Sequence, residues 1–445
     1  MLIPSIDFTK TIGKINPDHH GSNSTIPFNG GAFTRDYNDL GFTFSRTHDW
    51  ALWINGQRII DTHFIFPLMH LDPTDPKNYF FTPTDDIIKK CIDSGSKVFY
   101  RLGTSIEHTG NKHYNTVVPD DFEKYAEVLA AIVRHYTKGW ANGFTYDITH
   151  WEIWNEPDLG EAMWLGTAEE FAKLFAIVLK RLKDEFPNLQ IGGPALCGPK
   201  EDYFKLLFAE CDKLGVRPDF ISWHCYTADP DFLIEQPKAM RDFLDAYGYK
   251  DTKLVINEWH YFPHSYGISD AQWNAPNIRQ LAYNTDIGMG NIDSAVFNLA
   301  VLSGWQKTPL DIGCYYGASP NSLAYGYYNS DFARNKCYYS MKLFGDFVAK
   351  AVDMVESPSK LGKTYTIAGL SSDRKKGYLI LSNYRSDDET LEVDLKGVPE
   401  NSHIDVRILD ANHDLAPVPF IWHDGRLTLT KTSRTSAAFF ITVSL

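Results

Sequence analysis

A chain of 445 residues, with 43% apolar and 22% charged side chains, can bury a large core without disulfides or metal ions. Its net charge of −13 argues against nucleic acid or an anionic membrane as a partner. The six cysteines are scattered without a Cys-x-x-Cys pair, which argues against a zinc site and a disulfide scaffold, so we expect no metal and no cofactor.

The first ten residues, MLIPSIDFTK, lack the basic and apolar regions of a signal peptide. No apolar run approaches the roughly 20 residues that cross a bilayer. We therefore expect a cytoplasmic protein without a membrane partner, or a secreted one if a leader has been trimmed away.

Short segments rich in β-branched and aromatic residues alternate with amphipathic helical patterns through most of the chain. Asp120–Tyr136 carries apolar residues at helical spacing, and Thr167–Phe186 begins with Thr167 and Glu170 in a capping-box arrangement. Eight strands alternating with such helices predict a closed (β/α)₈ TIM barrel over residues 11–347. A doubly wound open sheet is the rival, but no Gly-x-Gly-x-x-Gly follows the first strand. The predicted strands are Ile12–His19, Phe42–Arg46, Lys97–Leu102, Ile148–Trp154, Leu189–Gly193, Asp219–His224, Lys253–Asn257 and Ile292–Phe297.

The pattern changes near Asp346, where short alternating segments separated by turn residues begin. This pattern predicts an antiparallel β-sandwich domain over residues 348–445. A strand within residues 1–10 is expected to join it, because the termini of a barrel often lie near one another. The predicted strands here are Tyr365–Ile367, Gly377–Leu381, Thr390–Leu395, Ile404–Leu409, Leu427–Leu429 and Ala437–Val443.

The sharpest local signal is the run HWEIWNEP at residues 150–157, which ends a predicted strand. Catalytic residues of a barrel project from the carboxyl ends of its strands, so Glu156 is a candidate catalytic carboxylate. Average residue usage puts a chance Trp-Asn-Glu-Pro in a chain of this length well below about one per cent. The structural alternative is a helix start with Asn155 as N-cap and Pro157 in the first turn, which is compatible with a catalytic role.

The second signal is the run LVINEW at residues 254–259, where the predicted strand Lys253–Asn257 is followed directly by the carboxylate of Glu258. Alone this signal is weak, because a glutamate at the end of a strand is often only solvated. Glu156 and Glu258 are 102 residues apart, which is three βα units of about 34 residues each, so both lie on one rim, on strands 4 and 7. Two carboxylates about 5–5.5 Å apart hydrolyse a glycosidic bond with retention. Glu156 would be the proton donor, and Glu258 would attack.

Polar residues near these two glutamates are candidates for substrate binding, and a structural role is the alternative for each. Asn155 is placed to hold the 2-hydroxyl of a sugar. His224 and Tyr226 lie two residues apart after strand 6 and can face one side of the rim, where Tyr226 could keep the nucleophile ionised. After strand 2, His48 is the better ligand candidate, because Arg46 is equally well explained by a buried ion pair.

Together these features resemble glycoside hydrolase family 39, within a clan of retaining barrel glycosidases that carry their glutamates on strands 4 and 7. The resemblance implies a barrel with a β-sandwich and a β-xylosidase-like enzyme that cleaves short oligosaccharides by double displacement. Relatives also act on arabinosides, iduronides and exopolysaccharides. The resemblance covers about residues 11–345. It rests on Arg46, His48, residues 154–157, the family-specific IGGPA at residues 191–195, Asp219, Phe220, His224, Tyr226 and Glu258.

The resemblance departs at strand 8, where the similar xylosidases carry a tryptophan as an aromatic floor for the sugar. The predicted strand Ile292–Phe297 places Asn298 at its end, and Trp305 lies further along the chain. We therefore expect either that Trp305 reaches the sugar from the following loop or that this subsite differs.

Two further classes of function are compatible with a barrel. A carbohydrate-binding barrel that has lost catalysis is one, but both glutamates are intact. A metal-dependent barrel hydrolase is the other, and the pair His19-His20 has no second His/Asp cluster to match it. We expect a glycoside or oligosaccharide as the partner, and the sequence leaves open whether the chain forms a homo-oligomer.

Overall fold

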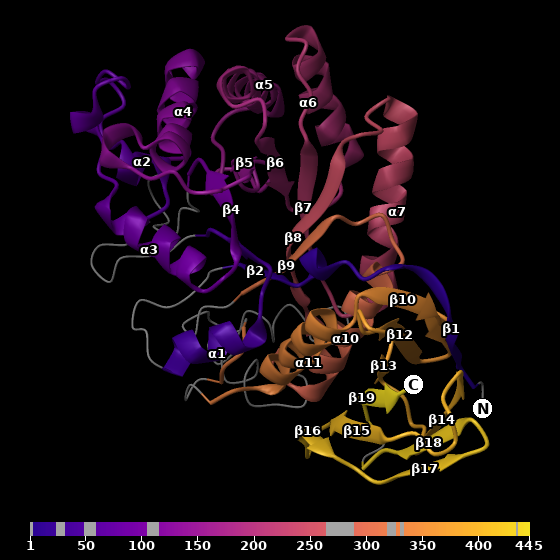
Figure 1. Cartoon of the computed structure of the whole chain (residues 1–445). Coiled ribbons are helices and arrows are strands. Elements are labelled where there is room, and N and C mark those ends of the chain that lie inside the picture. The colour runs from indigo at the N-terminus through magenta and orange to yellow at the C-terminus, as the bar shows by residue number, and fades with distance from the viewer. Residues whose placement is uncertain are drawn as a thin grey trace.

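The structure, a computed structural model, describes residues 3–23, 32–48, 59–104, 115–263, 289–317, 326–329, 333–432 and 435–445. These residues form a closed barrel of eight parallel strands and an 11-stranded, mostly antiparallel sheet (Figure 1). The predicted fold class, a (β/α)₈ barrel with an accessory β domain, is confirmed. No helix within these ranges is long and apolar enough to cross a membrane.

The barrel strands are hydrogen-bonded to one another in chain order, and the last pairs with the first. Helices α4 to α7 cover one side of the barrel (Figure 1). The strands are β2 (Gly21–Asn23), β3 (Phe44–Arg46), β4 (Lys97–Leu102), β5 (His150–Ile153), β6 (Gln190–Leu196), β7 (Phe220–Thr227), β8 (Lys253–Tyr261) and β9 (Ile312–Tyr315).

The two helices with clear sequence patterns, α4 and α5, each begin with a side chain that caps the first turn. Before α4, the Asp121 side chain accepts a hydrogen bond from the amide of Lys124. Before α5, Thr167 and Glu170 form both hydrogen bonds of the predicted capping box. The helices are α1 (Ala32–Leu40), α2 (Thr62–Ile65), α3 (Thr82–Asp93), α4 (Phe122–Lys138), α5 (Ala168–Glu185), α6 (Glu201–Lys213), α7 (Pro230–Tyr247), α10 (Ile292–Trp305) and α11 (Lys336–Lys350), with short 3₁₀ turns at Pro17–His19, Pro76–Asn78 and Trp140–Asn142.

The interior of the barrel changes from apolar to polar along the strands. Because side chains alternate along a strand, residues two apart point the same way and form successive layers. Arg46, Arg101, Ser222 and Asn257 are buried two residues beyond members of an apolar cluster. The barrel therefore holds buried polar groups near the carboxyl ends of its strands, above an apolar plug. That plug is the cluster of Phe44, Phe99, Phe220, Val255, Ile312 and Cys314.

The predicted first barrel strand, Ile12–His19, is wrong. The chain over Ser5–Lys14 is β1 of the second sheet, and the first barrel strand is β2, which has only three residues. The sequence of β2 is Gly-Ser-Asn, without a β-branched or aromatic side chain, so its composition could not indicate a strand.

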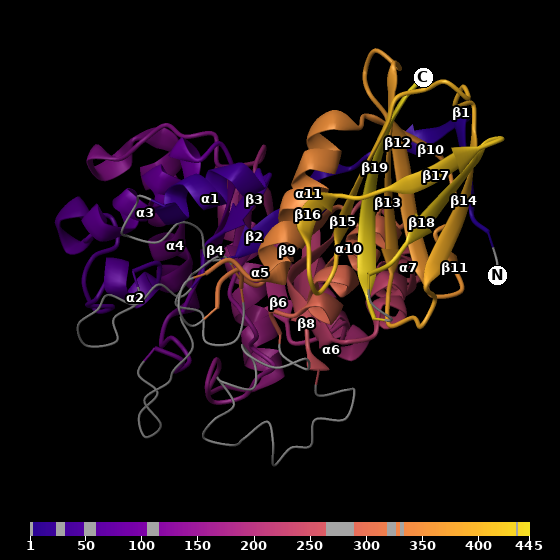
Figure 2. The same cartoon turned by 90° about the horizontal axis from the view of Figure 1, so that it is seen from below.

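The predicted eighth strand, Ile292–Phe297, is also wrong, because this segment begins α10 and the eighth strand is β9. Every residue from Ser294 to Trp305 is buried, since α10 lies between the barrel and the second sheet (Figure 2). A helix buried on all sides has no polar face and lacks the helical period in its sequence. The signal that could have identified it is Asn291, whose side chain caps the helix by accepting from the Ser294 amide.

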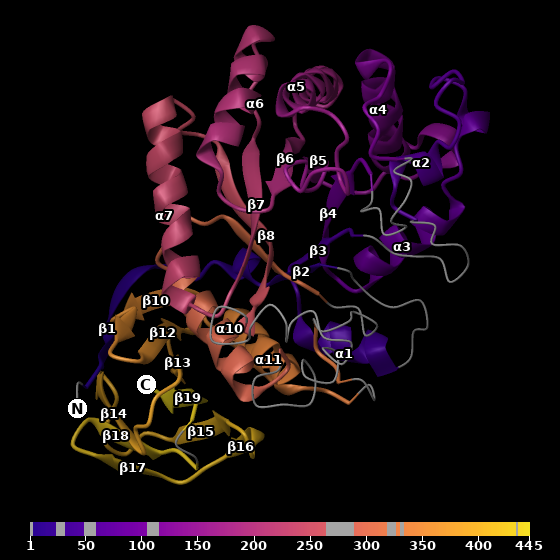
Figure 3. The same ribbon diagram turned by 180° about the vertical axis from the view of Figure 1, so that it is seen from behind.

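The second sheet combines the N-terminal strand with the C-terminal part of the chain. β1 runs antiparallel to β10 and parallel to β14 (Figure 3). The strand order is β16-β15-β19-β13-β12-β10-β1-β14-β18-β17, and β11 pairs with β12. The strands are β1 (Ser5–Lys14), β10 (Asp353–Glu356), β11 (Lys360–Leu361), β12 (Thr364–Leu370), β13 (Lys376–Asn383), β14 (Thr390–Lys396), β15 (Ile404–Leu409), β16 (Asp414–Pro417), β17 (Phe420–His423), β18 (Arg426–Thr430) and β19 (Ala437–Ser444).

The second sheet is bonded to the segments that follow β7 and β8. Arg385, just after β13, donates to Asp293 at the start of α10 and to the Tyr261 hydroxyl at the end of β8. The neighbouring Tyr384 hydroxyl donates to the carbonyl oxygen of Ala228, just after β7. Because β7 carries His224 and Tyr226 and β8 carries Glu258, the second sheet supports the part of the barrel rim that holds these candidate residues.

Gly192→Ala in β6 is expected to destabilise the fold strongly. A Cβ at Gly192 would lie 2.1 Å from the carbonyl oxygen of Phe220 in β7, so a strand would have to move. We expect a loss of about 3 kcal/mol in the free energy of unfolding, measured by denaturant titration. Gly198→Ala is the matched control, because no heavy atom beyond its chain neighbours lies within 4 Å of that Cβ position. Equal stability of the two variants would contradict the close packing of β6 on β7.

Candidate active site

Glu156, His224 and Glu258 meet at the carboxyl ends of β5, β7 and β8. One ligand atom from each side chain lies within 4.8 Å of those from the other two. Glu258 is 5% exposed, whereas Glu156 is half-buried. The structure thus brings together the two carboxylates that the sequence placed on one rim.

The backbone around Glu156 leaves the ordinary strand conformation. Trp154, the residue after β5, has φ +75° and Glu156 has φ +47°, in the left-handed region that is unfavourable for residues other than glycine. The Trp154 amide donates to the carbonyl oxygen of Leu102 and the Glu156 amide to that of Ala195, both at 2.9 Å. These bonds hold the irregular turn against β4 and β6 and keep Glu156 next to His224.

A β-bulge in β8 places two consecutive side chains in the barrel interior. Trp223 of β7 pairs with Ile256, but the next residue, His224, pairs with Glu258, so Asn257 is the extra residue. Without the bulge, Asn257 and Glu258 would point to opposite faces of the strand. With it, Asn257 bonds to a carboxylate in the polar layer and Glu258 reaches the rim of the same interior.

Arg46 is fully buried in the polar layer and uses all five of its N–H groups. Nε and Nη2 donate to Glu152 Oε2 at 2.8 and 2.6 Å. Nη1 donates to Glu258 Oε1 at 2.8 Å and to Asn23 at 2.9 Å, and Nη2 also donates to Asn155 Oδ1 at 2.7 Å. Of the two explanations left open by the sequence, the buried ion pair therefore holds for Arg46, which fixes Asn155 and Glu258 relative to each other.

Glu258 is surrounded by hydrogen-bond donors. Besides Arg46, His48 Nε2 lies 2.8 Å from Oε1, and the Tyr226 hydroxyl donates to Oε2 at 2.8 Å. Burial raises the pKa of Glu258, but the charges of His224 and His48, the His48 hydrogen bond and the charge of Arg46 outweigh it and hold the pKa well below its usual 4.5. Glu258 is therefore an ionised, buried carboxylate at neutral pH.

His224 lies between the two catalytic candidates. Its Nδ1 is 2.7 Å from Glu156 Oε1 and 3.4 Å from Glu258 Oε2. Burial lowers the pKa of His224, but the charges of Glu258 and Glu156 and the hydrogen bond to Glu156 raise it above its usual value. His224 thus links the two carboxylates and balances part of their negative charge.

The chemistry of these groups does not fit a metal centre. In the part of the chain that the structure describes, Glu156, His224 and Glu258 are the group with metal-ligand spacing. However, both oxygens of Glu258 already accept hydrogen bonds, and the Arg46 guanidinium 2.8 Å away would repel a cation.

The pair His19-His20 is structural. His19 Nε2 and His20 Nε2 each lie 2.8 Å from a backbone carbonyl oxygen, of Leu310 and Leu40 respectively. Burial lowers the pKa of both imidazoles to about 4. The histidines that suggested a metal-dependent hydrolase are therefore neutral members of the core.

The expectation that Trp305 contacts substrate is wrong. Trp305 ends α10, is fully buried, and donates its indole N–H to the carbonyl oxygen of Leu233 at 3.2 Å. The aromatic residue that follows the true eighth strand is Tyr316. Its ring lies 5.1 Å from that of His48 and 6.2 Å from that of Tyr226, between centroids. Tyr316 is half-buried beside the two side chains that bind Glu258, at the end of strand 8, where the resemblance implies an aromatic residue.

The polar layer beneath the carboxylates is not among the features that the sequence predicts. That layer contains Asn23, Glu152, Ser222 and Asn257 around Arg46. One signal was available: Glu152 is a charged residue inside an otherwise apolar strand, and such a residue is rarely buried without a partner. The partner itself, Arg46, lies 106 residues earlier, and no local pattern connects the two.

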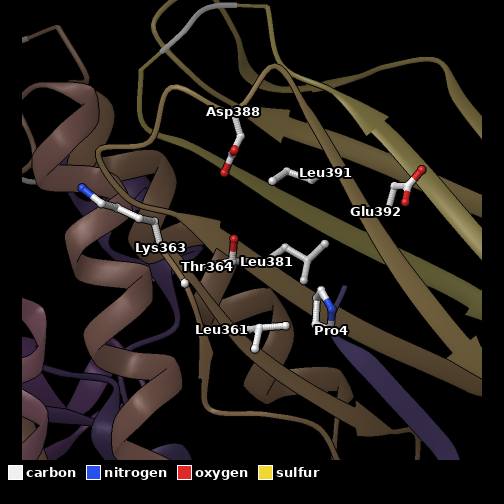
Figure 4. A pocket seen from close by; sticks show the side chains of 9 residues that line it. Pro4, Leu361, Lys363, Thr364, Leu381, Asp388, Leu391 and Glu392 are labelled. Atoms are coloured by element: carbon white, nitrogen blue, oxygen red, sulfur yellow. The ribbon is translucent and has the colours of Figure 1, made fainter. Parts of the chain in front are cut away.

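A recess lies on the C-terminal sheet, beside the β11–β12 hairpin (Figure 4). Among the described residues that line it there is no aromatic ring, whereas protein sites for sugars commonly use one. We therefore assign it no part in substrate binding. Its lining consists of Pro4, Leu361, Gly362, Lys363, Thr364, Leu381, Asp388, Leu391 and Glu392.

Comparisons with known proteins identify the family and the fold. The model of the family "Glycosyl hydrolases family 39" matches residues 32–279. A "Beta-xylosidase" of Caldicellulosiruptor saccharolyticus is 24% identical over 394 residues, which span 84% of this chain and 76% of that protein. Among solved structures, a glucosidase from Croceicoccus marinus has a TM-score of 0.80 at 20% identity over the whole of both chains. A monomeric beta-xylosidase from Caulobacter crescentus CB15 has a TM-score of 0.69 at 15% identity over 100% of this chain and 99% of its own.

Proposed function

The chain belongs to glycosyl hydrolases family 39, and from that premise we propose that it cleaves β-glycosides with retention of configuration, with Glu258 as nucleophile and Glu156 as acid/base. One observation carries the proposal: the two carboxylates come within 4.8 Å while three donors bind Glu258. Inverting enzymes keep their carboxyl groups roughly 6.5–9.5 Å apart to admit a water, so the shorter separation supports a double displacement.

Two steps follow from this assignment. First, a Glu258 oxygen bonds to the anomeric carbon while that carbon's bond to the leaving oxygen breaks, and Glu156 transfers its proton to the leaving oxygen. Second, a water oxygen bonds to the anomeric carbon, its proton passes to Glu156, and Glu258 departs as a carboxylate. Each glutamate ends in the protonation state in which it began, so no cofactor is needed for balance.

Asn155 is suited to hold the sugar during both steps. Its Oδ1 accepts a hydrogen bond from Arg46 at 2.7 Å, and this bond orients the amide so that its oxygen faces the polar layer. Its NH₂ group is then the donor that remains for the 2-hydroxyl, a contact that strengthens in the transition state. We assign Tyr226 and His48 to the support of Glu258, and Tyr316 to the wall against which the sugar ring lies.

For the substrate we propose a β-xyloside of a short oligosaccharide. The Caldicellulosiruptor saccharolyticus and Geobacillus stearothermophilus relatives are both named beta-xylosidases, and the second is 26% identical over 215 residues, 43% of this chain and 40% of that protein. Tyr316 in place of the tryptophan expected after strand 8 gives a smaller, polar-tipped aromatic surface. Arabinosides, iduronides and exopolysaccharides are the alternatives, and for the first of these the other solved structures of this fold include arabinofuranosidases.

The test is a panel of nitrophenyl glycosides with product configuration followed by NMR. The panel contains the β-xyloside, glucoside, galactoside, arabinopyranoside and α-arabinofuranoside. We expect the β-xyloside to have the highest kcat/KM and the β anomer of xylose to form first. First formation of the α anomer would refute the mechanism, whereas a preference for another sugar would change only the substrate.

The acid limb of kcat/KM is expected to lie well below pH 4.5. A depressed pKa means that Glu258 keeps its charge until the pH falls through that lower value, so attack is lost only there. His48→Gln removes a charge and a hydrogen bond that lower the pKa of Glu258, and should move the limb upward toward pH 4.5. Profiles of kcat/KM from about pH 3 to about pH 7 measure the shift. His423→Gln, at a side chain that is 87% exposed on β17, is the control and should leave the limb in place.

A further inference from the structure

Glu152 is a buried carboxylate that takes no part in the two steps above. It lies on β5, below Glu156, and is completely buried. Its Oε2 accepts from Nε and Nη2 of Arg46 at 2.8 and 2.6 Å, and its Oε1 accepts from the Ser222 hydroxyl at 2.5 Å and from the Asn257 amide. A buried carboxylate is costly to desolvate, and the four hydrogen bonds from these donors offset that cost.

Arg46 is shared between this carboxylate and the nucleophile. One guanidinium contacts Glu152 through two N–H groups and Glu258 through a third. We propose that Glu152 is a positioning residue that divides the charge of Arg46 with Glu258, and thereby keeps the nucleophile basic enough to attack the anomeric carbon. This inference rests on the proposed function, because it takes Glu258 to be the nucleophile.

Removing the charge of Glu152 would leave the whole charge of Arg46 to act on Glu258 at 2.8 Å, within a region of low dielectric. A more strongly stabilised carboxylate is a weaker nucleophile in the first step and a better leaving group in the second. Both transition states also carry positive charge on the sugar, so the loss of a nearby negative charge slows both steps. The ratio of the two rate constants therefore separates sharing of the charge from a general loss of order.

Glu152→Gln removes the charge and keeps the shape. The NH₂ group of the new glutamine would face the NH₂ group of Asn257, which now donates to Oε1 of Glu152. Asn257 Oδ1 has no hydrogen-bond partner among the described residues, so rotation of the Asn257 amide would turn this oxygen toward the new N–H groups. The variant can thus satisfy its buried polar atoms, and a thermal melt establishes whether it is folded.

The experiment measures the two steps separately by rapid mixing with a dinitrophenyl β-xyloside, or with the glycoside that the panel prefers. The burst gives the rate constant for formation of the glycosyl-enzyme, and the steady state gives that for its hydrolysis. In Glu152→Gln, we expect the ratio of hydrolysis to formation to rise about tenfold, the factor that corresponds to one pKa unit in the nucleophile. Ser222→Ala is the matched control: it removes one hydrogen bond from the same carboxylate but keeps the charge, so its ratio should equal that of the wild type.

Glu152→Asp keeps the charge but withdraws it from Arg46 by one methylene. In this variant the ratio of hydrolysis to formation should rise by about two- to threefold, a value between those of the wild type and Glu152→Gln. The reason is that the attraction between the carboxylate and Arg46 weakens with distance. If Glu152→Gln does not fold, this variant decides the question. Equal ratios in the wild type and in every folded Glu152 variant, even with lower rates, would overturn the proposal.

Failure of the underlying function gives a different result. Wild-type enzyme treated with a 2-fluoro glycoside should carry the sugar on the peptide that contains Glu258. If another residue is labelled, the assignment of the nucleophile falls and the role of Glu152 falls with it. If Glu258 is labelled and the ratios do not move, only the role of Glu152 is wrong.

Discussion

Glu258→Gln is expected to abolish hydrolysis of aryl glycosides, with a fall in kcat on the order of 10⁴-fold or more. An amide oxygen of glutamine is too weak a nucleophile to form the bond to the anomeric carbon. The substituted side chain has the same shape. Its remaining oxygen can still accept from Arg46, and its NH₂ group can donate to the Tyr226 hydroxyl oxygen, so the loss should be chemical and not structural. Initial rates with the nitrophenyl glycoside that the panel prefers measure it, over incubations long enough to reveal a residual activity.

The matched control for this variant is Glu201→Gln at the exposed start of α6, which should keep full activity. Azide supplies a second check through Glu258→Ala, because a small anion that enters in place of the carboxylate attacks from the same side. The glycosyl azide should then have the configuration opposite to that of the substrate. Normal turnover by Glu258→Gln would remove Glu258 from the mechanism.

The two glutamates could be predicted from the sequence because each lies in a local pattern. Glu156 follows a strand within a rare tetrapeptide, and the 102 residues to Glu258 correspond to three units of a regular barrel. A repeated βα unit makes sequence distance a measure of position around the rim. The same regularity predicted six of the eight barrel strands at their correct places, from β3 to β8.

What escaped prediction depends on contacts between distant segments. The bulge at Asn257 exists only in the pairing of β7 with β8, and the sequence of β8 alone gives no sign of it. Arg46 and Glu152 meet across 106 residues. Trp305 was misplaced for another reason: α10 is covered by both the barrel and the second sheet, so the helical period that reveals surface helices is absent.

The position of the eighth strand determines which aromatic side chain lies beside Glu258. With β9 at Ile312–Tyr315, the residue at the rim is Tyr316, whose ring approaches those of His48 and Tyr226. Both of these side chains bind Glu258, one at each oxygen. A sugar that lies on Tyr316 would therefore have its anomeric carbon close to the nucleophile, which connects the choice of substrate to the geometry of attack.

Glu156→Ala is expected to separate the two steps of the reaction. With a dinitrophenyl glycoside the leaving group departs without a proton, so formation of the glycosyl-enzyme should stay fast. Its hydrolysis should slow by about 10²- to 10⁴-fold, because no base remains to accept a proton from water. With a poor leaving group, such as an alkyl glycoside, the first step should fall by a similar factor. Burst kinetics with the two substrates measure this difference.

Azide should restore turnover of Glu156→Ala, since an anion attacks the glycosyl-enzyme without the help of a base. Because the attack comes from the side of the missing Glu156, the glycosyl azide should have the configuration of the substrate, opposite to the product expected with Glu258→Ala. Glu169→Ala, exposed in the first turn of α5, is the control. Its turnover should not rise with azide, and it should depend on the leaving group as in the wild type. The two azide products identify which face of the sugar each glutamate serves, and identical products from both variants would contradict the assignment of roles, even if both variants were inactive in water.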